Sequence, residues 1–325
     1  MIVSSDSAPG ATGLVAKLIE ADPRGLTVVA PEALPLDGEG VEVVRVDGEV
    51  TTGESGGARG ASRADLTRVA RLLADRRHGP KRMVVVLEAG ADVGVAAQTF
   101  LADQWLRRST DLDALVATVD APRACARLAA FEELARGTAA VDLAIADVVV
   151  VNGLGQTTTR GTQRLMAALR ATNPVAAVVD ADVEHPSGLS SRVFGRAAFS
   201  PQRWSSPAGS GIERHPARGR SAHHHQSAWV TVQVDGELDE ASLDLWLAEL
   251  HERHEREGAR VFRLHGSFAV TGGPNRLVAR GVGHVVEVVD GRPWGADNRS
   301  SWVQLAGSGV SEEMVHSTLE ACRVS

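Results

Sequence analysis

The stretch from Leu112 to Gly155 decides the fold. It begins LDALVATVDA (112–121) and ends AIADVVVVNGLG (144–155). Two valine-rich runs lie within it, at 115–119 and 148–151, and a polar residue follows each. Short β-branched runs separated by helical segments are typical of buried parallel strands. The second run brings Asn152 to the carboxyl end of its strand, where open α/β sheets bind their ligands.

The same alternation of strand and helix extends over residues 1–184. Further strands are predicted at 2–4, 26–30, 41–46 and 83–87, and helices at 14–20, 66–73, 95–107 and 163–170. The helix at 66–73 follows a capping-box pattern at 62–65. These elements predict an α/β domain with a mostly parallel sheet covered by helices on both faces.

The composition changes at residue 185. Residues 185–226 are rich in Ser, Gly, Pro, Arg and His and contain six arginines against one acid, Glu213, which predicts a linker or a partly ordered crossing loop. Residues 227–325 then form a second, smaller α+β domain in the order β-α-β-β-β-β-α. Its strands are predicted at 229–234, 261–270, 277–278, 282–289 and 302–306, and its first helix at 240–254. The last helix is capped by Ser311.

Composition narrows the class of protein. A net charge of −7 argues against a general nucleic-acid binder. No apolar run approaches the roughly 18–20 residues of a membrane span, and the N-terminus lacks the basic region of a signal peptide. The two cysteines, Cys125 and Cys322, are far apart and form no CxxC, which argues against a cysteine zinc site. We therefore expect a cytoplasmic protein.

Five segments resemble one known family in the same order. They are LDALVATVDA (112–121), AIADVVVVN (144–152), LRATNPVA (169–176), VFRLHGSFAVTG (261–272) and SSWVQLAGSGVSEEMVHSTLEAC (300–322). The first three resemble segments of the CobW-type P-loop GTPases, and the last two resemble the CobW C-terminal domain. The resemblance implies a P-loop NTPase-like domain, a His-rich linker and a CobW C-terminal domain. It also implies a GTP-dependent metallochaperone that uses GTP with Mg²⁺ and delivers zinc, cobalt or nickel, often in zinc starvation.

The phosphate-binding loop of that family is only partly retained. GxxxxGK[ST] corresponds here to residues 5–12, SDSAPGAT, which keep Gly10 and Thr12. Ala11 replaces the lysine that meets the phosphate oxygens, and Pro9 has no N–H to donate. Lys17 lies about 10 Å further along a helix axis and cannot easily substitute. We expect a decayed nucleotide site and inactive or weak nucleoside-triphosphate hydrolysis.

Other nucleotide positions are also altered. Asn152-Gly153-Leu154-Gly155 replaces the base-reading NKxD, so the lysine and aspartate that recognise guanine are missing. Glu88 and Gly90, in LEAGAD (87–92), correspond to family residues near the γ-phosphate. Glu32 corresponds to the acid of an Asn-Glu pair. The predicted nucleotide-site residues are therefore Gly10, Thr12, Glu32, Glu88, Gly90 and Asn152.

A metal site with thiolate ligands is excluded at the family's GCxCC position, because residues 51–59 contain no cysteine. The remaining metal candidates are histidines: His223, His224 and His225, with His215 nearby, and His251 and His254 three residues apart. The favoured interpretation is that these histidines belong to a solvated linker and to an exposed helical face, without a metal. His265 replaces the lysine of the family's RxKG, and nothing in the sequence explains the change.

Three hypotheses follow. The first is a divergent CobW-like protein with a decayed nucleotide site that binds a protein partner in zinc homeostasis or the zinc-starvation response. The ribosome is one possible acidic partner, suggested by the arginines of 185–226. The second is an active GTP-dependent metallochaperone with a histidine-based Zn²⁺ site. The third is a subunit that pairs with an intact paralogue.

Overall fold

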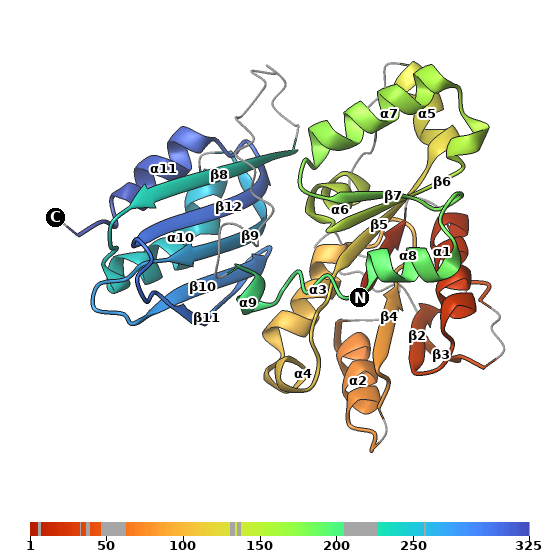
Figure 1. Cartoon of the computed structure of the whole chain (residues 1–325), viewed down its shortest axis with the longest axis horizontal. Coiled ribbons are helices and arrows are strands. Elements are labelled where there is room, and N and C mark those ends of the chain that lie inside the picture. Colours follow the sequence, from red (N-terminus) through yellow and green to blue (C-terminus); the bar gives the residue numbers. More distant parts are fainter. Residues whose placement is uncertain are drawn as a thin grey trace. The chain divides into compact units, whose positions relative to one another are not determined.

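The computed structural model divides into two compact units, residues 1–198 and 199–325. It describes residues 1–5, 8–32, 34–36, 40–46, 63–77, 79–130, 134, 138–204, 227–256 and 258–324. Each unit has its own sheet and its own hydrophobic core (Figure 1). Within the described residues, no helix is long and apolar enough to cross a membrane.

The first unit is built on a seven-stranded sheet in the order β3-β2-β4-β1-β5-β6-β7, with every pair parallel. Its strands are β1 Ile2–Ser5, β2 Leu26–Pro31, β3 Glu42–Val46, β4 Arg82–Val86, β5 Leu115–Asp120, β6 Val148–Asn152 and β7 Ala177–Asp180. The two valine-rich runs are adjacent strands, with Val116 in register with Val148. The predicted parallel α/β sheet is confirmed, and β7 is an additional strand at its edge.

Helices cover both faces of this sheet (Figure 1). They are α1 Ala8–Ala21, α2 Arg63–Ala74, α3 Val93–Ala102, α4 Gln104–Ser109, α5 Ala121–Ala129, α6 Thr138–Ile145, α7 Thr159–Thr172 and α8 Pro186–Val193. The single helix predicted over 95–107 is wrong, because it is divided at Asp103. The Asp103 carboxylate accepts hydrogen bonds from the backbone N–H groups of Trp105 (3.1 Å) and Leu106 (2.9 Å), and so begins α4.

The segment predicted as a linker from residue 185 starts instead with a helix. α8 buries Leu189 and Val193 in the core cluster that contains the apolar residues of α1. The division between the units falls after Ala198, and a four-residue helix, α9 (Pro201–Trp204), begins the second unit. The apolar positions of α8 explain the difference, since they bury surface that a solvated linker would expose. Residues 205–226 lie outside the described part of the chain.

The second unit is a five-stranded antiparallel sheet in the order β11-β10-β9-β12-β8. Its strands are β8 Ser227–Asp235, β9 Arg260–Phe268, β10 Asn275–Val282, β11 Val285–Pro293 and β12 Ser300–Ser308. Its long helices are α10 Glu240–Arg256 and α11 Glu312–Glu320. The predicted element order is confirmed, as is the Ser311 cap, whose hydroxyl accepts from the N–H of Met314 (3.2 Å). The strands predicted at 277–278 and 282–289 are wrong in their bounds, because the chain turns at Gly283 (φ +53).

Candidate functional site

The candidate site is the crevice at the carboxyl ends of β1 and β5. These strands are neighbours, but β1 leads through α1 towards β2 on one side, whereas β5 leads towards β6 on the other. Such a switch in direction is where open α/β sheets bind ligands. The last residues in register across it are Ser5 of β1 and Thr118 of β5.

The two predicted phosphate-loop residues lie in the first turns of α1. Gly10 is buried, and a Cβ on it would lie 2.8 Å from Oγ1 of Thr118 and 3.1 Å from Oγ of Ser5. Glycine is therefore required here for α1 to approach β5. Thr12 is half-buried and lies two residues further along α1. Residues 6 and 7, which complete the turn, lie outside the described residues.

The polar groups under this turn bond to each other. The Thr118 hydroxyl donates to Oγ of Ser5 over 2.7 Å, and both residues are buried. Ala11, at the lysine position, is 1% exposed and packs in the core of the domain. The ammonium group of Lys17 donates to the carbonyl oxygen of Ala181, beyond the end of β7. That contact holds the ammonium group of Lys17 on the backbone that follows β7.

The predicted acids follow the neighbouring strands β2 and β4. Glu32 is exposed immediately after β2, and Glu88 is half-buried two residues after β4. Gly90 has a left-handed backbone (φ +86), and its carbonyl oxygen accepts a hydrogen bond from Oγ1 of Thr138 (3.0 Å). Asp92 then caps α3 by accepting from the N–H groups of Gly94 and Val95. Residues 88–92 are therefore a tight turn into a helix.

At the base-reading position, Asn152 ends β6 in register with Asp120 of β5. Its Nδ2 is buried and has no hydrogen-bond partner within the described residues. Gly153 is left-handed (φ +77), and a Cβ there would lie 2.9 Å from Cδ of Pro122. The turn thus needs glycine after Asn152 for both backbone and packing reasons. The structure brings all six predicted nucleotide-site residues to this one edge of the sheet.

Asp142 of α6 also lies close to this edge, and sequence reasoning missed it. It is 5% exposed, and its Oδ1 accepts from the N–H of Val93 (3.3 Å). Burial raises the pKa of the Asp142 carboxyl to about 7, against the opposing effect of hydrogen bonds from Val93 and Ser4. The adjoining cavity of about 20 Å³ has room for one water molecule and none for a ligand. An acid inside the apolar run AVDLAIA (140–146) was the available signal.

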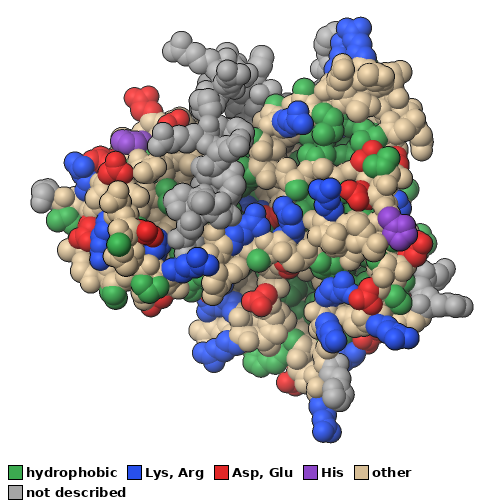
Figure 2. Space-filling model, in the orientation of Figure 1, with side chains coloured by type: hydrophobic (Ala, Val, Ile, Leu, Met, Phe, Trp, Pro, Cys, Tyr) green, Lys and Arg blue, Asp and Glu red, His purple; other side chains and the backbone are tan. Residues whose placement is uncertain are grey.

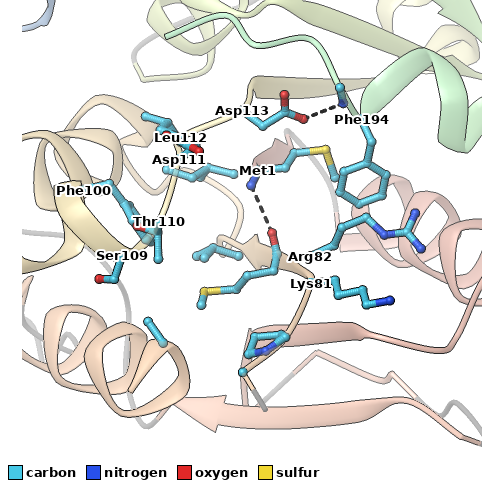
Figure 3. Close-up of a pocket in the computed structure, with 17 residues that line it drawn as sticks. Met1, Lys81, Arg82, Phe100, Ser109, Thr110, Asp111, Leu112, Asp113 and Phe194 are labelled. Carbon is cyan, nitrogen blue, oxygen red and sulfur yellow. Dashed lines mark hydrogen bonds between the residues drawn. The ribbon is translucent and has the colours of Figure 1, made fainter. Parts of the chain in front are cut away.

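A larger cavity, of about 550 Å³, lies at the opposite, amino-terminal ends of β1, β4 and β5 (Figure 3). Its lining includes the apolar residues Met1, Phe100 and Phe194. The Asp113 carboxylate there accepts from the N–H groups of Gly195 (2.9 Å) and Ala197 (2.7 Å). None of the predicted site residues lines this cavity, and it is separate from the candidate site.

The metal candidates are not brought together. His215, His223, His224 and His225 lie outside the described residues. His251 and His254 are in α10, but their side chains are also outside the described part. Among the described residues, no group of three or more His, Cys, Asp or Glu side chains is placed to hold a metal ion. The loop at 51–59 is likewise outside the described residues.

Comparisons with known proteins agree with this architecture. Residues 227–323 match the family model described as the cobalamin synthesis protein cobW C-terminal domain. A zinc-bound triple mutant of the YjiA GTPase is similar in structure, with a TM-score of 0.63 and 16% identity over 99% of this chain and 98% of that one. Zinc-bound YjiA GTPase from E. coli gives 0.60 and 18% over the same shares. No curated protein matches the sequence.

Two predictions are confirmed by these matches. The second unit is a CobW C-terminal domain, and the whole chain has the fold of the YjiA GTPase. At 16–18% identity the structural likeness concerns the fold alone.

Proposed function

We propose that this chain is a divergent CobW-like protein of the cytoplasm whose nucleotide site has decayed and which acts by binding a protein partner. Its role is in zinc homeostasis or the zinc-starvation response. The observation that carries the proposal is that no lysine side chain is placed to bind phosphate at the phosphate-loop position. Ala11 is packed in the core where the loop needs an ammonium group, and Lys17 is bonded to the backbone at Ala181.

The residues at the crevice do not fit a tightly held Mg-GTP. Pro9 has no N–H to offer a phosphate, and the hydroxyls of Ser5 and Thr118 are engaged with each other. After β6, Gly155 stands where a carboxylate would recognise guanine. A phosphate loop works through its backbone N–H groups, its lysine and its hydroxyl acting together. No hydrolytic step is therefore assigned to this site.

The link with zinc comes from the resemblance to the CobW family and from the two solved structures of YjiA, both of which are zinc-bound. Because residues 51–59 contain no cysteine, a thiolate zinc site at the family position is ruled out, and we propose that the zinc connection lies in the partner. The active metallochaperone with a histidine-based site is the competing proposal.

The kind of partner is constrained by charge. On the face shown in Figure 2, basic and acidic side chains are interspersed. With the net charge of −7, this supports a protein partner rather than general nucleic-acid binding. A ribosome-associated factor and a family paralogue are two such partners. Affinity capture of the tagged chain from its native cells distinguishes them by the protein recovered, and a chain recovered alone and monomeric would contradict the pairing model.

Calorimetric titration of the full chain tests the proposed function. We expect Mg-GTP and Mg-ATP to give dissociation constants weaker than about 10 μM, which corresponds to roughly 7 kcal/mol of binding free energy. The YjiA GTPase from E. coli, titrated in the same buffer, serves as the positive control. Titration with Zn²⁺ is the second arm. Nucleotide binding tighter than about 10 μM together with stoichiometric zinc uptake would replace this proposal with the active metallochaperone.

A further inference from the structure

The face of the second sheet opposite the core that α10 and α11 share with it is covered by Trp204 of α9 and carries an unusual set of buried polar side chains. His265 and Ser267 alternate on β9 and point to the same face. On the adjacent strand β12, Gln304 is in register with His265, and Trp302 is in register with Ser267. Residues in register on neighbouring strands lie side by side on the sheet, so these four side chains form one compact group. With Arg263 we call it the His265 patch.

Each of the four has a buried polar atom without a hydrogen-bond partner among the described residues. The atoms are Nδ1 of His265, Oγ of Ser267, Nε1 of Trp302 and Oε1 of Gln304. The residues are 0%, 1%, 5% and 3% exposed, respectively. Buried polar groups in folded proteins nearly always have a partner, so four neighbouring exceptions indicate a surface that is completed by another molecule.

The hydrogen-bonding character of these atoms indicates which kind of ligand would satisfy them. Nε of Arg263 donates to Nε2 of His265 over 2.7 Å, so Nε2 is the acceptor and the ring proton is on Nδ1. The His265 Nδ1–H, the Ser267 hydroxyl and the Trp302 indole N–H are then donors. The Ser267 hydroxyl can also accept, and the Gln304 oxygen is an acceptor only. The group therefore calls for a ligand rich in acceptor atoms.

The electrostatic surroundings are positive. Burial lowers the pKa of His265 well below its ordinary value, and the guanidinium groups of Arg263, Arg203 and Arg280 lower it further. Glu287 on β11 pairs with Arg280 (2.6 Å). A neutral histidine among arginines favours a negatively charged ligand over a neutral one.

An apolar cover lies on the patch. The ring of Trp204, in α9, stacks on His265 with centroids 3.9 Å apart and an interplanar angle of 9°. Phe199 lies under the Arg263 guanidinium at 4.6 Å, and Trp204 also packs against Trp302 at 6.0 Å. These rings bury the donors but offer them no acceptor oxygen. A ligand with carboxylates would give these buried donors the hydrogen bonds that the covering rings do not give them.

We propose that the His265 patch is a docking surface for an acidic peptide segment of a partner protein, which displaces Trp204 and accepts hydrogen bonds from His265, Ser267 and Trp302. A peptide fits better than a free anion, because the donors are spread over two strands and are closed off until α9 moves. The inference rests on the proposed function, in that it assigns the surface through which the partner is bound.

Fluorescence anisotropy of the full chain with a fluorescein-labelled ten-residue peptide of alternating Glu and Gly tests the proposal. The same peptide with Gln in place of Glu is the control ligand. We expect the Glu peptide to bind at least tenfold more tightly than the Gln peptide. We also expect it to shift the Trp302 indole N–H resonance, assigned by loss of that signal in Trp302→Phe.

Variants of the His265 patch distinguish specific binding at the patch from non-specific electrostatic attraction of the acidic peptide. His265→Phe keeps a ring for Trp204 to stack on but removes the Nδ1 donor, and it should weaken binding at least fivefold. Ser267→Ala, which is nearly isosteric, should weaken it about threefold and remains informative if His265→Phe does not fold. Trp204→Ala removes the cover and should tighten binding at least threefold. His316→Phe, exposed on α11, is the matched control and should change nothing.

Equal binding of the Glu and Gln peptides, or unchanged affinity in both His265→Phe and Ser267→Ala, would overturn the proposal. The two proposals fail separately. Tight GTP binding would overturn the decayed site and leave the docking result standing. An acidic peptide that does not bind, with GTP binding still weak, would overturn only the patch.

Discussion

At the carboxyl edge of the first sheet, the buried hydroxyls of Ser5 and Thr118 bond to each other, whereas the buried polar atoms around His265 on the second sheet have no partner among the described residues. The first region has the place in the fold where a ligand is expected and one buried polar atom without a partner among the described residues, Nδ2 of Asn152, whereas the second region gathers four such atoms in one group. The place that a fold offers to a ligand and the place where unsatisfied polar atoms gather are therefore separate, and here they lie in different units.

The largest expected difference concerns Asp142, under the edge of the first sheet. Its folded-state pKa of about 7 lies above the value of about 4 in an unfolded chain, so the folded state retains a proton that the unfolded state loses. The free energy of unfolding should therefore fall as the pH rises through this interval, by roughly 3 kcal/mol between pH 5 and pH 8. Asp142→Asn keeps an acceptor for the Val93 N–H but does not titrate.

Urea unfolding at the two pH values measures this effect. Asp142→Asn should match the native chain at pH 5 and exceed it in stability at pH 8. Asp111→Asn, at an exposed position, is the control and should follow the native pH dependence. Parallel curves for the native chain and Asp142→Asn would show that this carboxyl is not held neutral by burial.

The next effect concerns the approach of α1 to β5. Gly10→Val places its Cβ 2.8 Å from Oγ1 of Thr118, and overpacking of this kind costs about 2–3 kcal/mol. Gly13→Ala, in the same helix with nothing within 4 Å, should instead stabilise the chain by up to about 1 kcal/mol through helix propensity. Thermal and urea unfolding of both variants measure the two signs. A tolerated Gly10→Val would mean that this glycine is not needed for packing.

The smallest effect compares the two regions directly. Ser5→Ala removes the acceptor of the Thr118 hydroxyl and should destabilise the chain by about 1 kcal/mol. Ser267→Ala removes a buried hydroxyl without a partner and should stabilise the free chain by a similar amount, about 1 kcal/mol. Chemical denaturation of the two variants in parallel gives the signs. Equal destabilisation would show that Ser267 is satisfied in solution.

Much of the fold could be predicted because the spacing of apolar residues indicates which side of each helix or strand is buried. The valine runs at 115–119 and 148–151 correspond to β5 and β6 almost residue for residue. β7 was missed because its run AVVD is only four residues long and contains only two β-branched residues. The helix at 95–107 was predicted as continuous because the capping role of Asp103 is visible only from its hydrogen bonds.

The chemistry of the sites was less predictable. The altered phosphate loop could be identified from Pro9 and Ala11 alone, but the engagement of Lys17 with Ala181 depends on tertiary structure. His265 had no explanation in the sequence. Its surroundings become visible only in the folded chain, where Trp204, 61 positions earlier, stacks on it and Gln304 is in register with it on the neighbouring strand.

The central claim is that the nucleotide site at β1 and β5 no longer binds its ligand tightly. Calorimetric titration of the full chain with Mg-GTP tests it most directly. A dissociation constant weaker than about 10 μM is predicted, because the phosphates would meet neither a lysine nor a complete set of backbone donors. A value well below that limit, with a stoichiometry of one nucleotide per chain, would contradict it.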